Sequence, residues 1–197
     1  LLKKRDDQLS SRLRSNKILV NVNFSYGVLA DKRDKWISDI LEACENVNID
    51  PKLSFHPQDF PKPKYTSKCN ISTQGLLDDL SNSKIFITRF SGALFEAILS
   101  GCHVIYYNPG IERIDKFNQP LDAYHYATTP NELVRSIREC LQKEFNLNTC
   151  NTFLSMHCNI NLENLQTSST TTVEAIKSVL ENSHSHYIDP NIFRQNI

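Results

Sequence analysis

This sequence has no excess of charge of either sign and no long apolar run. Lys plus Arg and Asp plus Glu number 22 each, so the formal net charge is zero. A neutral domain has no overall field to hold a polyanion, and the one short basic run, residues 3–5, is followed at once by two aspartates; we therefore expect no nucleic acid partner. No apolar run approaches the roughly 20 residues that span a bilayer, and no signal peptide opens the chain, which predicts a cytoplasmic protein.

Paired cysteines are also missing. None of the six cysteines forms a C-x-x-C pair, and Cys44 and Cys140 fall in apolar helical patterns. Disulfides or a metal remain alternatives, but this spacing favours reduced, buried thiols. The close ligand pairs His157-Cys158 and His184-Ser185-His186 lie in the tail with no second pair to complete a site, so we expect no metal and no cofactor.

Several phosphate-binding and catalytic motifs are absent. No G-x-G-x-x-G follows the first apolar strand and no G-x-x-x-x-G-K-[ST] occurs, which argues against dinucleotide and P-loop sites. The G-x-S-x-G turn of serine hydrolases is lacking as well.

Short apolar strands alternate with amphipathic helices along the middle of the chain. We predict strands at 17–23, 52–55, 69–71, 84–88, 104–107 and 124–126, and helices at 31–47, 74–81, 93–100 and from Pro130 onward. This alternation predicts an α/β fold, a doubly wound Rossmann-like parallel sheet with helices on both faces. Residues 1–15 are expected to form a connecting helix or linker, 16–146 the sheet domain, and 147–197 a helical extension with a loosely ordered tail.

Ligands of open α/β sheets bind beyond the carboxyl ends of the strands. That rule selects four loops here, residues 24–30, 56–60, 89–96 and 108–111. In the third loop, Ser91 and Gly92 open a helix whose N–H groups and dipole favour an anion such as a phosphate. Ser91 is also a good N-cap, and the two roles are compatible.

Glu96 lies in the otherwise apolar stretch Ala93–Leu99. A carboxylate on a buried helix is costly unless it is satisfied, and the hydroxyls of a ribose would satisfy it. The alternative is a glutamate that faces solvent from the edge of the helix.

Two further loops supply candidate contacts. Pro57 holds His56 in an extended conformation at a strand end, from which the imidazole could donate to a phosphate or a leaving group; the alternative is a plain loop residue. Gly27, with Ser25 and Tyr26, could let the backbone approach the leaving group, or could be an ordinary turn glycine.

The segment Ile85–Gly101, followed by Val104–Pro109, resembles the donor-binding segment of GT-B glycosyltransferases. Phe55-His56-Pro57 is similar to the His-Pro motif of bacterial capsule, sialyl- and Kdo-transferases, and teichoic-acid glycerophosphotransferases show a similar arrangement. The resemblance covers roughly residues 15–145 and implies one half of a GT-B fold.

The resemblance implies a role for each candidate residue. His56 and Ser91 would contact the phosphates of a nucleotide-sugar donor, Glu96 would hold its ribose, and Arg89 and Gly92 belong to the same donor site. Those families often have two adjacent serines where this chain has Ser91 and Gly92, which leaves a CMP-sugar assignment open.

The hypothesis that follows is the donor-binding half of a glycosyltransferase that moves a sugar to a surface polysaccharide or other glycan acceptor. In that family the acceptor belongs to an N-terminal half, so this chain would be incomplete without a partner domain. Peripheral membrane association would come through the full-length protein. Two alternatives stay open: a sugar-nucleotide epimerase of the same architecture, and a non-catalytic nucleotide-binding or scaffolding domain.

Overall fold

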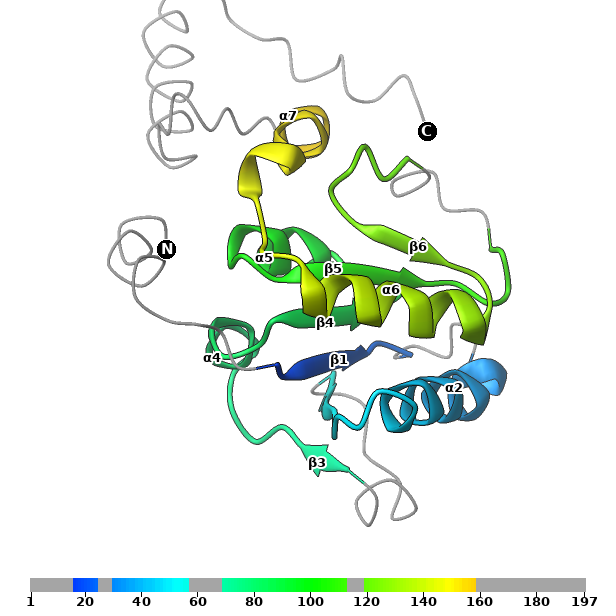
Figure 1. Cartoon of the computed structure of the whole chain (residues 1–197). Coiled ribbons are helices and arrows are strands. Elements are labelled where there is room, and N and C mark those ends of the chain that lie inside the picture. The colour runs from blue at the N-terminus through cyan, green and yellow to red at the C-terminus, as the bar shows by residue number, and fades with distance from the viewer. Residues whose placement is uncertain (1–15, 25–29, 57–68, 113–118, 159–197) are drawn as a thin grey trace, which may run out of the picture. The chain divides into compact units, whose positions relative to one another are not determined.

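In the computed structural model, six parallel strands form one sheet in the order β3-β2-β1-β4-β5-β6 (Figure 1). The structure describes residues 16–24, 30–56, 69–112 and 119–158. The strands are β1 (Ile18–Val22), β2 (Lys52–Phe55), β3 (Asn70–Ile71), β4 (Ile85–Thr88), β5 (His103–Tyr107) and β6 (His125–Ala127). The strand order reverses between β1 and β4, as it does in doubly wound Rossmann-like sheets. The predicted fold class is confirmed.

Helices cover both faces of this sheet. They are α2 (Arg33–Glu45, preceded by the 3-10 turn η2, Ala30–Lys32), α4 (Leu76–Ser81), α5 (Ala93–Leu99), α6 (Pro130–Gln142) and α7 (Asn151–Cys158, preceded by η3, Leu147–Cys150). Helices α2 and α6 lie together on one face and α5 lies on the other (Figure 1). The capping box of Thr129 and Glu132 and the first-turn Pro130 start α6 where the sequence predicts.

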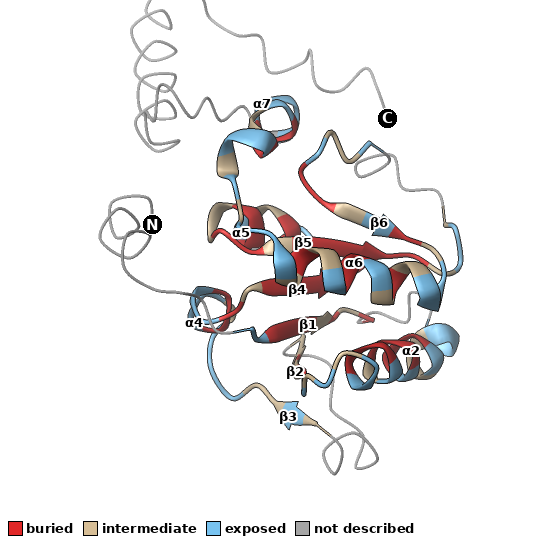
Figure 2. Ribbon diagram, viewed as in Figure 1, coloured by how far each residue is buried: buried red, intermediate tan, exposed pale blue. Residues whose placement is uncertain are grey.

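The core lies between the sheet and the pair α2–α6 (Figure 2). Ile18, Val20 and Val22 point to that side from β1, and Trp36 on α2 is 1% exposed. The indole N–H of Trp36 donates to the carbonyl oxygen of Tyr107 at 2.9 Å, which ties α2 to the end of β5. All four residues of β4 are buried, as the continuous apolar run predicts for a central parallel strand.

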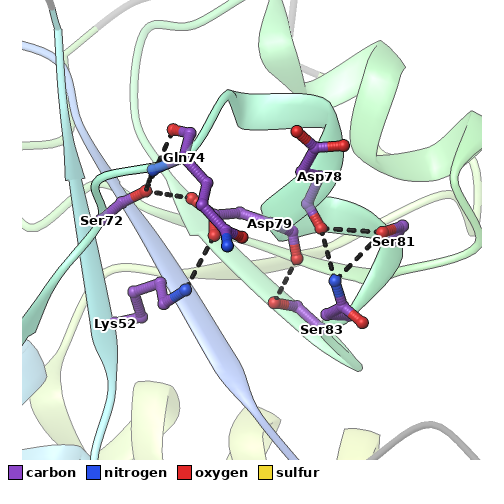
Figure 3. Close-up of polar contacts among 8 residues, drawn as sticks. Lys52, Ser72, Gln74, Asp78, Asp79, Ser81 and Ser83 are labelled. Carbon is purple, nitrogen blue, oxygen red and sulfur yellow. Dashed lines mark hydrogen bonds and ion pairs between the residues drawn. The ribbon is translucent and has the colours of Figure 1, made fainter.

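A buried carboxylate fastens α4 to the outer strands. The side chain of Asp79 is fully buried; it pairs with the Lys52 ammonium at 2.9 Å and accepts a hydrogen bond from the Ser72 hydroxyl (Figure 3). Its backbone carbonyl accepts from Ser83 at 2.8 Å. The neighbouring Asp78 is exposed. Asp79 thus joins β2, the end of β3 and α4, the elements that lead into β4.

Two histidines at the amino ends of β5 and β6 make stability depend on pH. Burial, together with the nearby charge of Lys84, lowers the pKa of His103; burial likewise lowers the pKa of His125, partly offset by Glu139. The unfolded chain therefore binds these protons more readily, so the free energy of unfolding should fall as pH drops from about 7.5 to about 5.5. Urea titrations should show a shallower fall for the double variant His103→Gln/His125→Gln. If the double variant shows the same fall in unfolding free energy with pH as the parent chain, other groups cause that fall.

Five of the cysteines are free thiols: Cys44, Cys69, Cys102, Cys140 and Cys150. Four of them are buried, and burial raises the pKa of Cys44 and of Cys140 to about 12. The prediction of buried thiols is confirmed for these four, whereas Cys69 is half-buried. Within the described ranges, no helix is long and apolar enough to cross a membrane.

Candidate functional site

The predicted site gathers at the carboxyl edge of the sheet, where the strand order reverses between β1 and β4. The loop 89–92 follows β4 and leads directly into α5. The end of β1 lies on one side of this loop and the end of β5 on the other, because β4 pairs with both strands. This edge is where ligands of doubly wound sheets bind.

Ser91 is held by hydrogen bonds from both sides of its loop. Its Oγ accepts from the Asn21 side-chain amide at 3.0 Å and from the Ala93 backbone N–H at 3.2 Å. The predicted capping role of Ser91 is confirmed, because its hydroxyl accepts from the Ala93 N–H at the start of α5. The helix itself begins at Ala93, so that Gly92, which makes no side-chain bond, takes the formal cap position.

The residue before Ser91 is pinned in an unusual conformation. Phe90 has φ of 50°, which costs free energy for a residue other than glycine. Its carbonyl accepts from the Asn23 side-chain amide at 3.0 Å, and its N–H donates to the Tyr106 hydroxyl at 3.3 Å. Burial raises the pKa of Tyr106 to about 12, so this hydroxyl stays neutral at physiological pH. Contacts from β1 and β5 therefore hold the loop in one shape.

Gly92 faces open space at the centre of this edge. It is exposed, and a Cβ added to it would meet no atom within 4 Å. The loop is therefore held by hydrogen bonds on the side that faces the sheet and is open to solvent at Gly92. This arrangement suits close approach of a ligand to the backbone.

Arg89 is buried in an ion pair. The residue is 3% exposed, and its Nη2 lies 3.0 Å from Oε1 of Glu112, which also pairs with the exposed Lys32. The guanidinium lies over the Phe24 ring at 5.0 Å. Among the described residues, its Nε and Nη2 make no aligned hydrogen bond, so the contact with Glu112 is mainly electrostatic. Direct contact of Arg89 with a donor, as the sequence predicts, would require this pair to open.

The loop after β5 holds Glu112 in position. Asn108 is fully buried; its amide donates to the Glu112 carbonyl at 3.0 Å and to the Tyr126 hydroxyl at 2.9 Å, and its oxygen accepts from the Glu112 N–H at 3.3 Å. A Cβ at Gly110 would collide with the Glu112 carboxylate, which explains the glycine.

Glu96 is exposed on α5, and the apolar face of that helix is formed by Ala93, Leu94, Ala97 and Ile98. The argument that Glu96 is a buried carboxylate in need of a partner is therefore wrong. Solvent exposure leaves Glu96 able to meet a ribose without prior burial, so its contact with a donor stays a prediction.

His56 lies immediately after β2, and its N–H donates to the Val22 carbonyl of β1 at 3.4 Å. One strand, β1, separates it from the Ser91 loop, and two strand spacings are about 10 Å. The two residues thus share one edge without adjoining. Ser25, Tyr26 and Gly27 lie outside the described residues.

Asn21 and Asn23 are part of the site that the sequence analysis missed. Both belong to the first strand or its end, and both donate to the Ser91 loop. The available signal was the pair of polar residues in the otherwise apolar stretch 18–24. A separate groove, lined by Asn46 and residues of α6 including Asn131, Arg135 and Arg138, contains none of the predicted site residues.

Comparisons with known proteins support the fold. No protein-family model matches the chain, and no curated protein matches its sequence. The structure is similar to that of UDP-GlcNAc 2-epimerase from Methanocaldococcus jannaschii in complex with UDP-GlcNAc and UDP, with TM-score 0.54 and 17% identity over 74% of this chain and 46% of that chain. It is also similar to a variant of the wall teichoic acid polymerase TagF, with TM-score 0.50 and 13% identity over 94% of this chain and 48% of that chain.

At such identities the similarity establishes the fold alone, a Rossmann-like parallel α/β sheet that this chain shares with part of each of these two proteins. The chain spans a little under half the length of these two proteins.

Proposed function

We propose that this chain binds a nucleotide-linked donor at the carboxyl edge of its sheet, as the donor half of a GT-B glycosyltransferase. The observation that carries the proposal is the Ser91–Gly92 loop, which is immobilised by β1 and β5 and opens to solvent at the strand reversal. The similar epimerase structure, whose complex contains UDP-GlcNAc and UDP, supports the same ligand class.

In this proposal different site residues contact different parts of the donor. Ser91 and His56 contact the phosphates from either side of β1, and Glu96 meets the ribose. Preorganised donors of this kind stabilise negative charge on a leaving nucleotide, in place of a metal. Ser25, Tyr26 and Gly27 would complete the phosphate side. Arg89 holds the loop through its pair with Glu112.

The acceptor side is proposed to come from another half. The chain spans less than half of each similar protein, and a GT-B site forms between two halves. A surface polysaccharide or other glycan acceptor, a cytoplasmic location and membrane association through the full-length protein remain proposals. Epimerisation of a sugar nucleotide is the second candidate, because one similar structure is an epimerase; conversion of UDP-GlcNAc without an acceptor would favour it.

Calorimetric titration of CMP, CDP, UDP, GDP and TDP into the chain tests the proposal. We expect saturable binding of at least one nucleotide. Ser91→Ala should weaken that binding about 10-fold or more, the usual value of a hydrogen bond to a charged group, and Glu96→Ala should weaken it as well. The matched control is Ser81→Ala, which removes an exposed hydroxyl at the end of α4, away from this edge.

Gly92→Val adds a steric test, because its side chain would enter open space and leave the fold intact. The variant should block binding while its melting temperature stays close to that of the parent chain. Binding that survives both Gly92→Val and Ser91→Ala would place the ligand elsewhere. Absence of binding for the whole panel would favour a scaffolding domain.

A further inference from the structure

The hydrogen bonds at Ser91 fix the direction in which its own proton can point. A serine hydroxyl offers one O–H donor and two acceptor lone pairs. At Ser91 both lone pairs are taken, one by the Asn21 side-chain amide at 3.0 Å and one by the Ala93 N–H at 3.2 Å. The capacity that remains is the O–H donor.

We propose that Asn21 is a positioning residue that makes the Ser91 hydroxyl an obligatory hydrogen-bond donor, so that the site selects an acceptor such as a phosphate oxygen over a donor-only group such as an ammonium. The inference rests on the proposed function and adds a selection rule to it. A ligand atom that needs an acceptor finds none at Ser91, because Asn21 and Ala93 already occupy both lone pairs.

The surroundings of Asn21 suit this role. It lies on β1, where it pairs with Ser54 of β2, and the preceding residue Val20 pairs with Ile87 of β4. Two residues further along, Asn23 donates to the Phe90 carbonyl and holds the Ser91 loop against the same strand. Ser91 itself is 9% exposed, which keeps water from competing freely for its lone pairs. The hydroxyl is therefore oriented before any ligand arrives.

Asn21→Asp is the decisive variant because it replaces the donor by an acceptor of the same size. The Ser91 proton would then turn to the new carboxylate and away from the ligand. With UDP or CDP, whichever the parent chain binds more tightly, we expect Asn21→Asp to weaken binding about 10- to 100-fold. The matching nucleoside, uridine or cytidine, lacks the phosphate, and its affinity should change less than about threefold. Asn21→Ala frees one lone pair without adding an acceptor and should cost only about threefold.

A double-mutant cycle separates this role from a general effect of negative charge. In the Ser91→Ala background there is no hydroxyl to redirect, so Asn21→Asp should lose most of its effect on nucleotide affinity. Equal effects in both backgrounds would overturn the positioning role, as would Asn21→Asp binding UDP or CDP as tightly as the parent chain. Should Asn21→Asp fail to fold, Asn21→Ala still decides, since an equal loss for nucleotide and nucleoside overturns the proposal.

These experiments also test the role of Asn21 separately from the proposed function. If Ser91→Ala weakens nucleotide binding and Asn21→Asp does not, the role of Asn21 is contradicted and the proposed function stands. A parent chain that binds none of CMP, CDP, UDP, GDP and TDP contradicts the proposed function and the inference with it; should another diphosphate of that panel bind best, it and its nucleoside take the place of UDP or CDP in the test.

Discussion

Replacing Glu112 by alanine should lower the free energy of unfolding by about 3–5 kcal/mol, the usual cost of removing one partner from a buried ion pair. Arg89 is 3% exposed and lies 3.0 Å from the Glu112 carboxylate. Without that carboxylate, the guanidinium keeps its charge in a buried position, where the rings of Phe24 and Phe90 stabilise it far less than a carboxylate does. Urea unfolding monitored by circular dichroism would give the value.

Lys32→Met is the matched control, because Lys32 contacts the same Oε1 of Glu112 at the same 3.0 Å. The Lys32 side chain is 46% exposed, so its pair is screened by water and should contribute less than about 1 kcal/mol. Similar losses for the two variants would show that burial does not decide the strength of this pair. A loss below about 1 kcal/mol for Glu112→Ala would mean that Arg89 reaches water.

Replacing Asp79 by alanine should cost about 3 kcal/mol of unfolding free energy, the second largest effect we expect. The change removes a fully buried carboxylate that accepts from Lys52 and Ser72 (Figure 3). Because α4 leads into β4, a loosened α4 should also expose the start of that central strand. Hydrogen exchange of the β4 amides would then speed up.

Asp78→Ala provides the comparison for Asp79. The two residues are neighbours in the first turn of α4, and Asp78 is exposed. Removal of the exposed carboxylate should change the free energy of unfolding by less than about 0.5 kcal/mol. A cost for Asp78→Ala that matches Asp79→Ala would attribute the effect to charge at the start of α4 and not to the buried pair.

Local patterns in the sequence were sufficient for most of the fold. The apolar run at 84–88 predicted β4, and Pro130 predicted the start of α6. Gly101, with φ of 80°, directly follows the C-cap of α5, a position where glycine is common. The alternation of strands and helices gave the parallel sheet. These features depend on residues close together in the chain, which is why they can be read without the structure.

The candidate site was harder to predict because its contacts join distant residues. Asn21 stands out as a polar residue in an apolar stretch, but its hydrogen bond spans 70 positions to Ser91, so no local pattern identifies the partner. Glu96 is a different case, since its exposure can be read from the helix alone. At 100° per residue it lies about 130° from the middle of the apolar face of α5, which predicts the exposure that the structure shows.

Nuclear magnetic resonance titration of the labelled chain with UDP and CDP tests the central claim most directly, because it shows where a nucleotide binds as well as whether it does. The account predicts that the largest shift changes occur at the backbone amides of Gly92 and Ala93 and at the side-chain amide of Asn21. Changes confined to the groove lined by Asn46 and Arg138, or none with these two nucleotides or with CMP, GDP and TDP, would contradict it.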